Sequence, residues 1–237
     1  MYLTRFRFNT ARVGARRLLS SPQAMHAAVM WSFPEAPPAT GDGPRVLWRV
    51  DHNSPSQVLL YIVSPARPDL THLVEQAGWP TIASGGWESR PYTPFLTRLT
   101  AGTRWAFRLT ANPVHHIRRE DGEPTKRTAH ITARHQAQWL LDRQESAGFR
   151  IVEKPKHEHR LTDGGDTYDL VVHNRRGLSF RKTDRDSQRK HRVTLTTVTF
   201  DGRLQVTDPD ALRRTLTAGL GKAKAYGCGL MTLAPAE

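Results

Sequence analysis

The segment from Gly219 to Leu230 has a composition suited to a phosphate chain, because it combines four glycines with two lysines. Glycine lets a backbone turn sharply and approach a ligand, and a neighbouring lysine offers mobile positive charge. The spacing fits neither a Walker loop nor the GxGxxG motif, so a nucleic-acid backbone is a more natural partner than a nucleotide cofactor. The alternative is a tight turn between a helix and a strand. The expected contacts are Gly219, Gly221, Lys222, Lys224, Gly227 and Gly229.

A second candidate element is the tract from Arg175 to Arg192. It contains eight basic residues and only two acidic ones, Asp184 and Asp186. With strands on both sides, the tract predicts a long basic hairpin or loop. Such an arm can lie along an RNA or DNA backbone and supply salt-dependent affinity, although a solvated surface loop is the alternative. The expected contacts are Arg175, Arg176, Arg181, Lys182, Arg185, Arg189 and Lys190.

His26 is the best candidate for acid-base chemistry. On a helix beginning near Ser21, the spacing of Met25, Ala28, Val29 and Ser32 predicts the core face, and His26 lies about 100° from Met25. It therefore flanks the core and can face a cleft. An imidazole can take a proton from a ribose 2′-hydroxyl or give one to a leaving 5′-oxygen near neutral pH. Taken alone, such a histidine can equally be a hydrogen-bonded structural residue.

The composition also favours a polyanionic partner. The chain of 237 residues has 35 basic and 22 acidic residues, with a net charge of +13. Of the basic residues, 28 are arginine and 7 are lysine. The arginine guanidinium can bind a phosphate through two N–H groups at once and can also stack on exposed bases. A GC-rich source genome is the alternative explanation for the arginines. Residues 1–100 have a net charge of +4 and residues 101–237 one of +9, so the excess lies late in the chain.

Other classes of protein and site fit less well. No apolar run approaches the roughly 20 residues of a membrane span and no signal-peptide pattern is present, so we expect a cytoplasmic protein without a membrane partner. The single cysteine, Cys228, allows neither a disulfide framework nor a cysteine-rich zinc site. Carboxylates do not cluster as two-metal nucleases need, and no GxSxG motif occurs. Metal-free acid-base cleavage of RNA remains, with no metal or small-molecule cofactor.

The elements that would position these residues repeat one pattern. Residues 2–8 alternate as a strand does, Ser21-Pro22 predicts a helix start, 46–50 and 57–63 predict a hairpin, and 70–78 predict a second helix. Residues 84–99 hold a fourth strand or a linker. The later order is a strand at 104–109, a helix at 132–147, strands at 149–152, 168–180 and 193–200, a helix from Asp208-Pro209 to near Gly219, and a strand at 230–233.

Two tandem ferredoxin-like βαββαβ domains of the α+β class account for this order. The predicted domains are residues 1–90, with the histidine, and 104–237, with the basic hairpin and the glycine-rich segment. Residues 91–103 are predicted to be a linker between them.

Several segments together resemble the CRISPR-associated endoribonuclease family that processes CRISPR RNA in the type I-E (Cascade) system. They span almost the whole chain in the family's order. The matching segments are Met1-Tyr2-Leu3-Thr4, Met25-His26, Leu47-Trp48-Arg49, Phe107-Arg108-Leu109-Thr110-Ala111-Asn112-Pro113, Phe200-Asp201-Gly202-Arg203-Leu204, and residues 219–235.

The resemblance implies the same two-domain fold and binding of the CRISPR RNA repeat stem-loop. It further implies metal-independent cleavage at the 3′ base of the stem by 2′-hydroxyl attack. The protein would then retain the cleaved RNA as a subunit of the Cascade complex, together with the other Cascade subunits. His26 falls on the family's catalytic histidine. The basic hairpin corresponds to the element entering the major groove of the stem, which makes Arg181 and Lys182 expected contacts. The glycine-rich end corresponds to a loop near the RNA and the active site.

One position departs from the family pattern. Family members have a tyrosine three residues before the histidine, where this chain has Gln23. Glutamine can orient a neighbour but cannot exchange a proton near neutral pH, so a lysine such as Lys182, or an arginine, would have to stabilise the charge of the phosphorane. A non-catalytic RNA-binding subunit of the same complex is therefore the alternative function.

Overall fold

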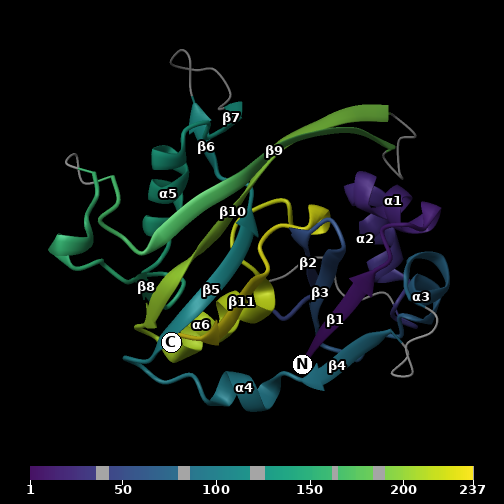
Figure 1. The fold of residues 1–237 in the computed structure, drawn as a ribbon, viewed down its shortest axis with the longest axis horizontal. Helices are drawn as coiled ribbons and strands as arrows, with labels where there is room; N and C mark the ends of the chain where they lie inside the picture. The colour runs from purple at the N-terminus through teal and green to yellow at the C-terminus, as the bar shows by residue number, and fades with distance from the viewer. Residues whose placement is uncertain (36–42, 80–85, 118–125, 162–164, 184–189, 237) are drawn as a thin grey trace. The chain divides into compact units, whose positions relative to one another are not determined.

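The computed structural model describes residues 1–35, 43–79, 86–117, 126–161, 165–183 and 190–236 (Figure 1). Contacts between Cα atoms divide the chain into two compact units. Unit 1 comprises Met1–Leu99 with Arg213–Leu230, and unit 2 comprises Thr100–Leu212 with Met231–Glu237. The glycine-rich segment therefore belongs to the unit that contains His26.

The sheet of unit 1 has four antiparallel strands in the order β2-β3-β1-β4. The strands are β1 (Tyr2–Phe8), β2 (Leu47–Ser54), β3 (Gln57–Ser64) and β4 (Trp87–Pro91). This is the strand order of a ferredoxin-like domain, as the sequence predicts. The segment 84–99, which fitted either a strand or a linker, contains the fourth strand. β2 lies at the edge of the sheet, and within the described part of the chain one side of its backbone has no strand partner.

Three helices of unit 1 accompany this sheet: α1 (Val13–Ser20), α2 (Pro22–Met30) and α3 (Thr71–Ala77). α2 begins where the sequence predicts. Ser21 Oγ caps the helix by accepting a hydrogen bond of 3.2 Å from the Ala24 amide, and proline follows the cap. α1 was not predicted. It contains Gly14, which is a weak helix former. A Cβ added to Gly14 would lie 2.2 Å from the Gln76 carbonyl oxygen, so α1 and the end of α3 approach closely.

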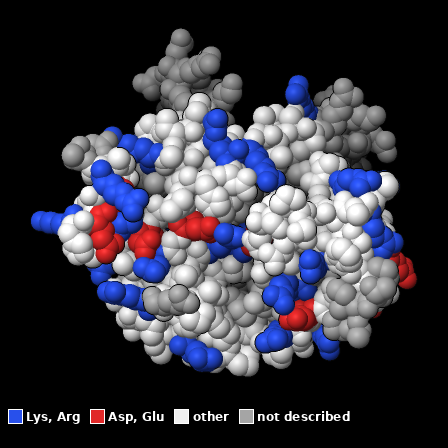
Figure 2. Space-filling model, in the orientation of Figure 1, with Lys and Arg blue, Asp and Glu red and all other residues white. Residues whose placement is uncertain are grey.

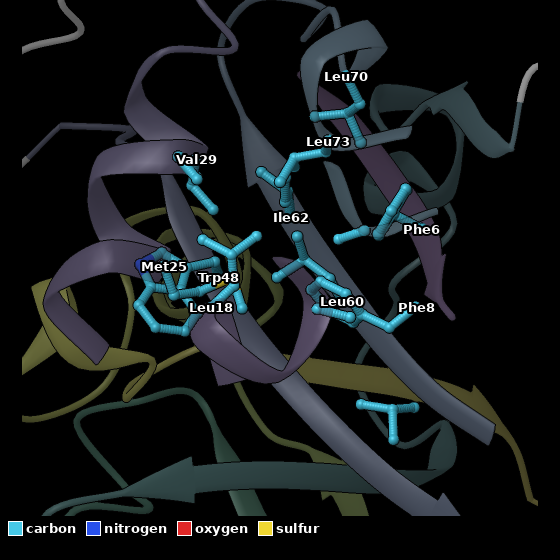
Figure 3. Packing of buried hydrophobic residues seen from close by; sticks show 14 of the residues in the cluster. Phe6, Phe8, Leu18, Met25, Val29, Trp48, Leu60, Ile62, Leu70 and Leu73 are labelled. Carbon is cyan, nitrogen blue, oxygen red and sulfur yellow. The ribbon is translucent and has the colours of Figure 1, made fainter. Parts of the chain in front are cut away.

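The hydrophobic core of unit 1 lies between these helices and one face of the sheet (Figure 3). Its members come from α1, α2 and α3, from the strands β1, β2 and β3, and from residues beside these elements, and they are almost completely buried. Representative members are Phe6 and Phe8 from β1, Trp48 from β2, Leu60 and Ile62 from β3, Leu18 from α1, Met25 and Val29 from α2, and Leu73 from α3. Burial of this cluster fixes α2, and hence His26, against the sheet.

Unit 2 repeats the arrangement with the strand order β11-β5-β10-β8, all pairs being antiparallel. The elements are β5 (Arg104–Ala111), α5 (Ala133–Leu141), β8 (Phe149–Ile151), β10 (Lys190–Val206) and β11 (Met231–Pro235), together with the start of α6 (Pro209–Ala218), whose residues from Arg213 onward belong to unit 1. Trp139 of α5 stacks on Phe200 of β10 with ring centroids 6.1 Å apart, which anchors the helix to the sheet. Two ferredoxin-like folds are therefore present, as predicted.

Unit 2 adds elements beyond that pattern. β9 (Leu170–Thr183) pairs with β10, a short hairpin joins β6 (Val114–Ile117) to β7 (Lys126–Ala129), and η1 (Lys156–Glu158) is a 3₁₀ turn. The β6-β7 hairpin was not predicted.

The two units differ from the predicted domains at two places: the predicted linker and the glycine-rich segment, which was predicted to belong to the second domain. Residues 91–99, predicted as part of a linker, contain α4 (Thr93–Thr97) and belong to unit 1. The amide of Tyr92 donates to the Met1 carbonyl at 2.8 Å, and Arg213 Nε donates to the Leu96 carbonyl at 2.8 Å. These bonds hold both α4 and the start of Arg213–Leu230 within unit 1. Among the described residues, no helix is long and apolar enough to cross a membrane.

Candidate active site

His26 lies on α2 at the border between the core and the surface. Met25, Ala28, Val29 and Ser32 are at most 5 % exposed, which confirms the predicted core face of this helix. His26 itself is half-buried, one position round from Met25. It is therefore neither enclosed in the core nor fully exposed, which suits a group that exchanges protons with a bound substrate.

Trp48 of β2 contacts the imidazole directly. Its indole Nε1 donates a hydrogen bond of 3.4 Å to Nδ1 of His26, and Trp48 is only 4 % exposed. In Figure 3 the indole lies beside Met25 in the core between α2 and the sheet. The sheet thus supplies a fixed partner for a side chain that projects from a helix.

The glycine-rich segment packs against the same place. Its 3₁₀ turn η2 (Lys224–Tyr226) contacts both α2 and β2. Gly227, just after this turn, has φ 79°, and a Cβ added to it would lie 2.7 Å from the Trp48 ring. Only glycine permits both this backbone conformation and this close approach. The segment therefore supports the tryptophan that contacts His26.

The segment and the end of α6 also contact the edge strand β2 and the residues just before it. The amide of Arg45, just before β2, donates to the Thr217 carbonyl at 3.1 Å, and the Leu220 amide donates to the Gly229 carbonyl at 2.9 Å, which closes the loop. Consecutive residues of a strand face opposite sides of a sheet. Gly219 approaches Leu47 and Gly227 approaches Trp48, so the segment reaches both faces of β2. The glycines are thus part of unit 1's structure as well as candidate contacts.

A buried charge pair lies next to Trp48 in β2. Arg49 is 1 % exposed, and its guanidinium donates to both carboxylate oxygens of Asp51 at 2.6 and 2.9 Å. The same guanidinium also donates to the Leu230 carbonyl at 3.0 Å. Burying an arginine is tolerated only when its charge and donors are satisfied. Arg49 therefore joins β2 to the end of the glycine-rich segment.

The other predicted residues of unit 1 differ in exposure. Gln23 is exposed on the first turn of α2, Lys222 is exposed, and Lys224 is half-buried on the turn that packs against α2. Cys228 is fully buried, and this burial raises the pKa of its thiol to about 12, which keeps it protonated at neutral pH. Lys222 and Lys224 thus belong to the glycine-rich segment, whose 3₁₀ turn contacts α2, whereas Lys182 belongs to unit 2.

The basic tract forms an antiparallel hairpin in unit 2, as predicted. β9 and β10 continue into the tract, so that Thr183 pairs with Lys190 and Arg181 with Arg192. Arg175, Arg176 and Arg192 are exposed. The side chains of Arg181, Lys182 and Lys190, and all of Arg185 and Arg189, lie outside the residues that the structure describes.

A bulge shapes this hairpin near its base. The register shifts between Thr197 and Thr199, and opposite this shift Asn174 adopts φ 54°. Bulges redirect side chains and are common beside functional sites. A groove of about 220 Å³ lies between β9 and the start of α5, with Gln136, Val172 and Arg175 among its lining residues. The hairpin therefore carries a concave surface with a basic side chain at its edge.

Two segments behind the family resemblance meet in the sheet of unit 2. Arg108 of β5 pairs with Asp201 of β10, with Nε–Oδ1 and Nη2–Oδ2 distances of 2.7 Å, and His173 Nε2 lies 2.9 Å from Oδ2. Burial raises the pKa of Asp201, but the hydrogen bonds and charges of Arg108 and His173 outweigh it and leave the pKa below its ordinary value. The carboxylate stays ionised and joins β5, β9 and β10.

Charge and metal-ligand patterns complete the description. Figure 2 shows basic side chains spread over one face of the molecule, with acidic side chains gathered at fewer places. Within the described ranges, no group of three or more His, Cys, Asp or Glu side chains is placed to hold a metal ion.

Two site residues had no assigned role in the sequence interpretation. Trp48 and Arg49 entered only as part of a matching tripeptide. One signal was available for Arg49, because a charged residue within the otherwise apolar strand 46–50 must find a partner if it is buried. Nothing local pointed to the contact between Trp48 and His26, since it depends on how α2 packs on β2.

Comparisons with known proteins agree with this architecture. A sequence model of the family described as CRISPR associated protein matches residues 1–235. The CRISPR-associated endoribonuclease Cse3 of Thermus thermophilus is 30 % identical over 235 residues, which cover 99 % of this chain and 100 % of the relative.

Solved structures agree as well. A structure of the CRISPR endoribonuclease Cse3 bound to 19 nt RNA has a TM-score of 0.73 and 27 % identity, covering 99 % of this chain and 100 % of the other. Thermus thermophilus Cse3 bound to an RNA representing a pre-cleavage complex has a TM-score of 0.66 and 27 % identity, with 99 % and 98 % covered. The chain therefore belongs to the CRISPR associated protein family, and its type I-E, CasE-type resemblance is confirmed.

Proposed function

We propose that this protein is a metal-independent endoribonuclease that binds the repeat stem-loop of precursor CRISPR RNA and cleaves it at the 3′ base of the stem. The observation that carries the proposal is the placement of His26, half-buried on α2, hydrogen-bonded to Trp48 and flanked by the glycine-rich segment. The full-length similarity to an endoribonuclease whose relatives were solved with RNA supports the substrate class.

The reaction needs two proton transfers. The ribose 2′-oxygen attacks the adjacent phosphorus, the bond from phosphorus to the 5′-oxygen breaks, and a 2′,3′-cyclic phosphate and a 5′-hydroxyl form. The 2′-hydroxyl loses a proton and the leaving 5′-oxygen gains one. His26 carries one of these transfers, because an imidazole exchanges protons near neutral pH. Lys224, on the turn packed against α2, is the predicted contact that we assign to support the negative charge on the phosphorus oxygens.

Binding of the stem is assigned to the basic hairpin and the glycine-rich segment. The hairpin presents Arg175, Arg176 and Arg192 to solvent. Arginine contacts with phosphates position an RNA without reading its sequence, and they make affinity depend on salt. The glycine-rich segment supplies backbone amides and two lysines beside α2. Affinity would then reside largely in these elements, and the chemical step in His26.

The protein is further proposed to keep its product and to act in the cytoplasm as a subunit of Cascade together with the other subunits. A second candidate function is a non-catalytic RNA-binding subunit of the same complex. Gln23 favours it, because an exposed glutamine stands where the resemblance leads one to expect tyrosine. Both candidates predict RNA binding, and only the first predicts cleavage.

Cleavage of cognate repeat RNA in EDTA separates the two candidates. The wild-type protein should cleave at the 3′ base of the stem and leave a 2′,3′-cyclic or 3′-phosphate end. The His26→Ala variant should bind with a nearly unchanged Kd and lose cleavage by at least about 100-fold, the usual contribution of general acid-base catalysis. RNA with a 2′-deoxy nucleotide at the cleavage position should bind and remain intact.

Three outcomes would count against this mechanism. If EDTA stops the wild type, the reaction depends on a metal ion. If His26→Ala cleaves at the wild-type rate, His26 is not catalytic. If the wild-type protein binds the repeat but never cleaves it, the non-catalytic function is the correct one.

A further inference from the structure

The hydrogen bond from Trp48 to His26 determines more than the position of the ring. The donor is the indole Nε1–H and the partner atom is Nδ1, at 3.4 Å. An indole nitrogen can only donate, so Nδ1 must accept with its lone pair. A neutral imidazole that accepts at one nitrogen carries its proton on the other. In this arrangement the neutral ring therefore has its proton on Nε2.

The indole is held so that it cannot easily turn away. Trp48 is 4 % exposed and belongs to the core cluster that contains Met25, the neighbour of His26 on α2. From the other side Gly227 lies against the ring, where even an added Cβ would approach to 2.7 Å. A donor fixed by packing on both sides is already oriented, so it pays little entropy to engage its partner.

We propose that Trp48 is the positioning residue of His26: its indole N–H holds Nδ1 and selects the neutral tautomer with the proton on Nε2. This inference rests on the proposed function, because it concerns the histidine that the function uses. It assigns a different role to each ring nitrogen. In the neutral ring Nε2–H is a donor suited to a phosphate oxygen, and the lone pair of Nδ1 is engaged by the indole N–H.

This assignment also bears on the departure at Gln23. That side chain is exposed at the start of α2, whereas Trp48 comes from the sheet and is buried. Orientation of the histidine then depends on packing between α2 and β2 rather than on a neighbour one turn earlier on the same helix. The glycine-rich segment contributes by holding the indole in place.

The test compares two variants that both remove the indole N–H of Trp48 but differ in how much of the buried ring they keep. Trp48→Phe removes the donor and part of the ring. Replacement of Trp48 by benzothienylalanine keeps the size and shape of the bicyclic ring and removes only the N–H, so it also serves if Trp48→Phe does not fold. The matched control is Trp79→Phe in the same unit, where the indole donates at 3.1 Å to the Phe8 carbonyl and not to a histidine.

The first readout is the tautomer of the ring in the free protein. Protein labelled with ¹⁵N histidine gives separate signals for protonated and unprotonated ring nitrogens, and the His26→Ala spectrum identifies the signals of His26 among the eleven histidines. The wild type and Trp79→Phe should show neutral His26 protonated on Nε2. Both Trp48 variants should show a mixture of tautomers.

The second readout is cleavage under single-turnover conditions. Both Trp48 variants should lose about 5- to 10-fold in rate, the effect of one hydrogen bond, with RNA Kd changed less than about 2-fold. Trp79→Phe should cleave normally. Neutral wild-type His26 protonated on Nδ1, or an unchanged tautomer in both Trp48 variants, would overturn the inference even if cleavage is confirmed. If instead His26→Ala cleaves normally, the proposed function fails while the tautomer measurement still decides the role of Trp48.

Discussion

Arg49 donates a hydrogen bond of 3.0 Å to the carbonyl oxygen of Leu230, a residue 181 positions later in the chain. The same guanidinium is paired with Asp51, and the whole group is buried in unit 1. This contact ties the end of the glycine-rich segment to the strand that carries Trp48. The candidate active site therefore depends on a contact between the two stretches of chain that make up unit 1.

We expect Arg49→Met to destabilise unit 1 by about 3–5 kcal/mol, because the buried carboxylate of Asp51 would lose both of its hydrogen bonds from the guanidinium. Urea unfolding followed by tryptophan fluorescence measures the change. The matched control is Arg5→Met, since Arg5 pairs with Glu88 at 3.2 Å on the surface and such pairs contribute about 0–1 kcal/mol. The double variant Arg49→Met with Asp51→Leu should recover part of the loss. Equal unfolding midpoints for Arg49→Met and Arg5→Met would contradict the role given to the buried pair.

Gly227→Ala should weaken both folding and cleavage. A positive φ costs alanine about 1–2 kcal/mol, and the added methyl group also collides with the Trp48 ring. Gly102→Ala is the control, because Gly102 has φ 85° but nothing within 4 Å of an added Cβ. Thermal unfolding should show a larger loss for Gly227→Ala, and only that variant should slow RNA cleavage. Identical effects of the two substitutions would show that the approach to Trp48 is unimportant.

Removal of exposed basic side chains from the β9-β10 hairpin should reduce the salt dependence of RNA binding. A variant with Arg175, Arg176 and Arg192 replaced by alanine should bind more weakly, and the slope of log affinity against log salt should fall by up to about 0.9 for each lost phosphate contact. Arg104→Ala serves as control, since Arg104 pairs with Gln205 at the opposite end of β10 from the hairpin tip. An unchanged slope would support the interpretation of the hairpin as a solvated surface element.

The stability of unit 2 should fall as the solution becomes acidic. Burial lowers the pKa of His130 below its ordinary value of 6.5, and the neighbouring His115 and His135 lower it further. Because the folded-state pKa lies below the unfolded one, the contribution of His130 is complete above about pH 6.5 and is lost as the pH falls through the folded-state value.

The measurement is the thermal unfolding midpoint at pH 7.5 and pH 5.5. The drop between the two should be smaller in His130→Gln than in the wild type. His157→Gln, at a residue whose side chain is 80 % exposed, should retain the wild-type drop. A drop that is the same in His130→Gln and the wild type would rule out His130 as a source of the pH dependence.

Local patterns in the sequence were sufficient for most of the secondary structure. Alternation over 2–8 gave β1, the Ser21-Pro22 cap gave the start of α2, and Asp208-Pro209 gave the start of α6, because each of these signals lies within a few residues of the element it specifies. The same local reasoning placed His26 at the edge of the core. The charge pattern similarly located the hairpin that β9 and β10 form.

Local patterns were less informative where an element depends on its neighbours. α1 was not predicted, and its Gly14, a weak helix former, is needed for the close approach of this helix to Gln76. β2 extends through Ser54 because β3 pairs with residues that, taken alone, have the composition of a turn. In both cases packing or pairing contributes more than the intrinsic preference of the residues.

By itself the sequence determined the candidates for the chemistry: one helix-flank histidine, a glycine-rich segment and a basic hairpin. The tertiary structure decided which of them meet. It brought Arg213–Leu230 into the unit of His26, placed Gly227 on Trp48, and placed Trp48 on His26. These contacts join residues far apart in the chain and form only when α2, β2 and the glycine-rich segment pack together, so no local period or spacing encodes them.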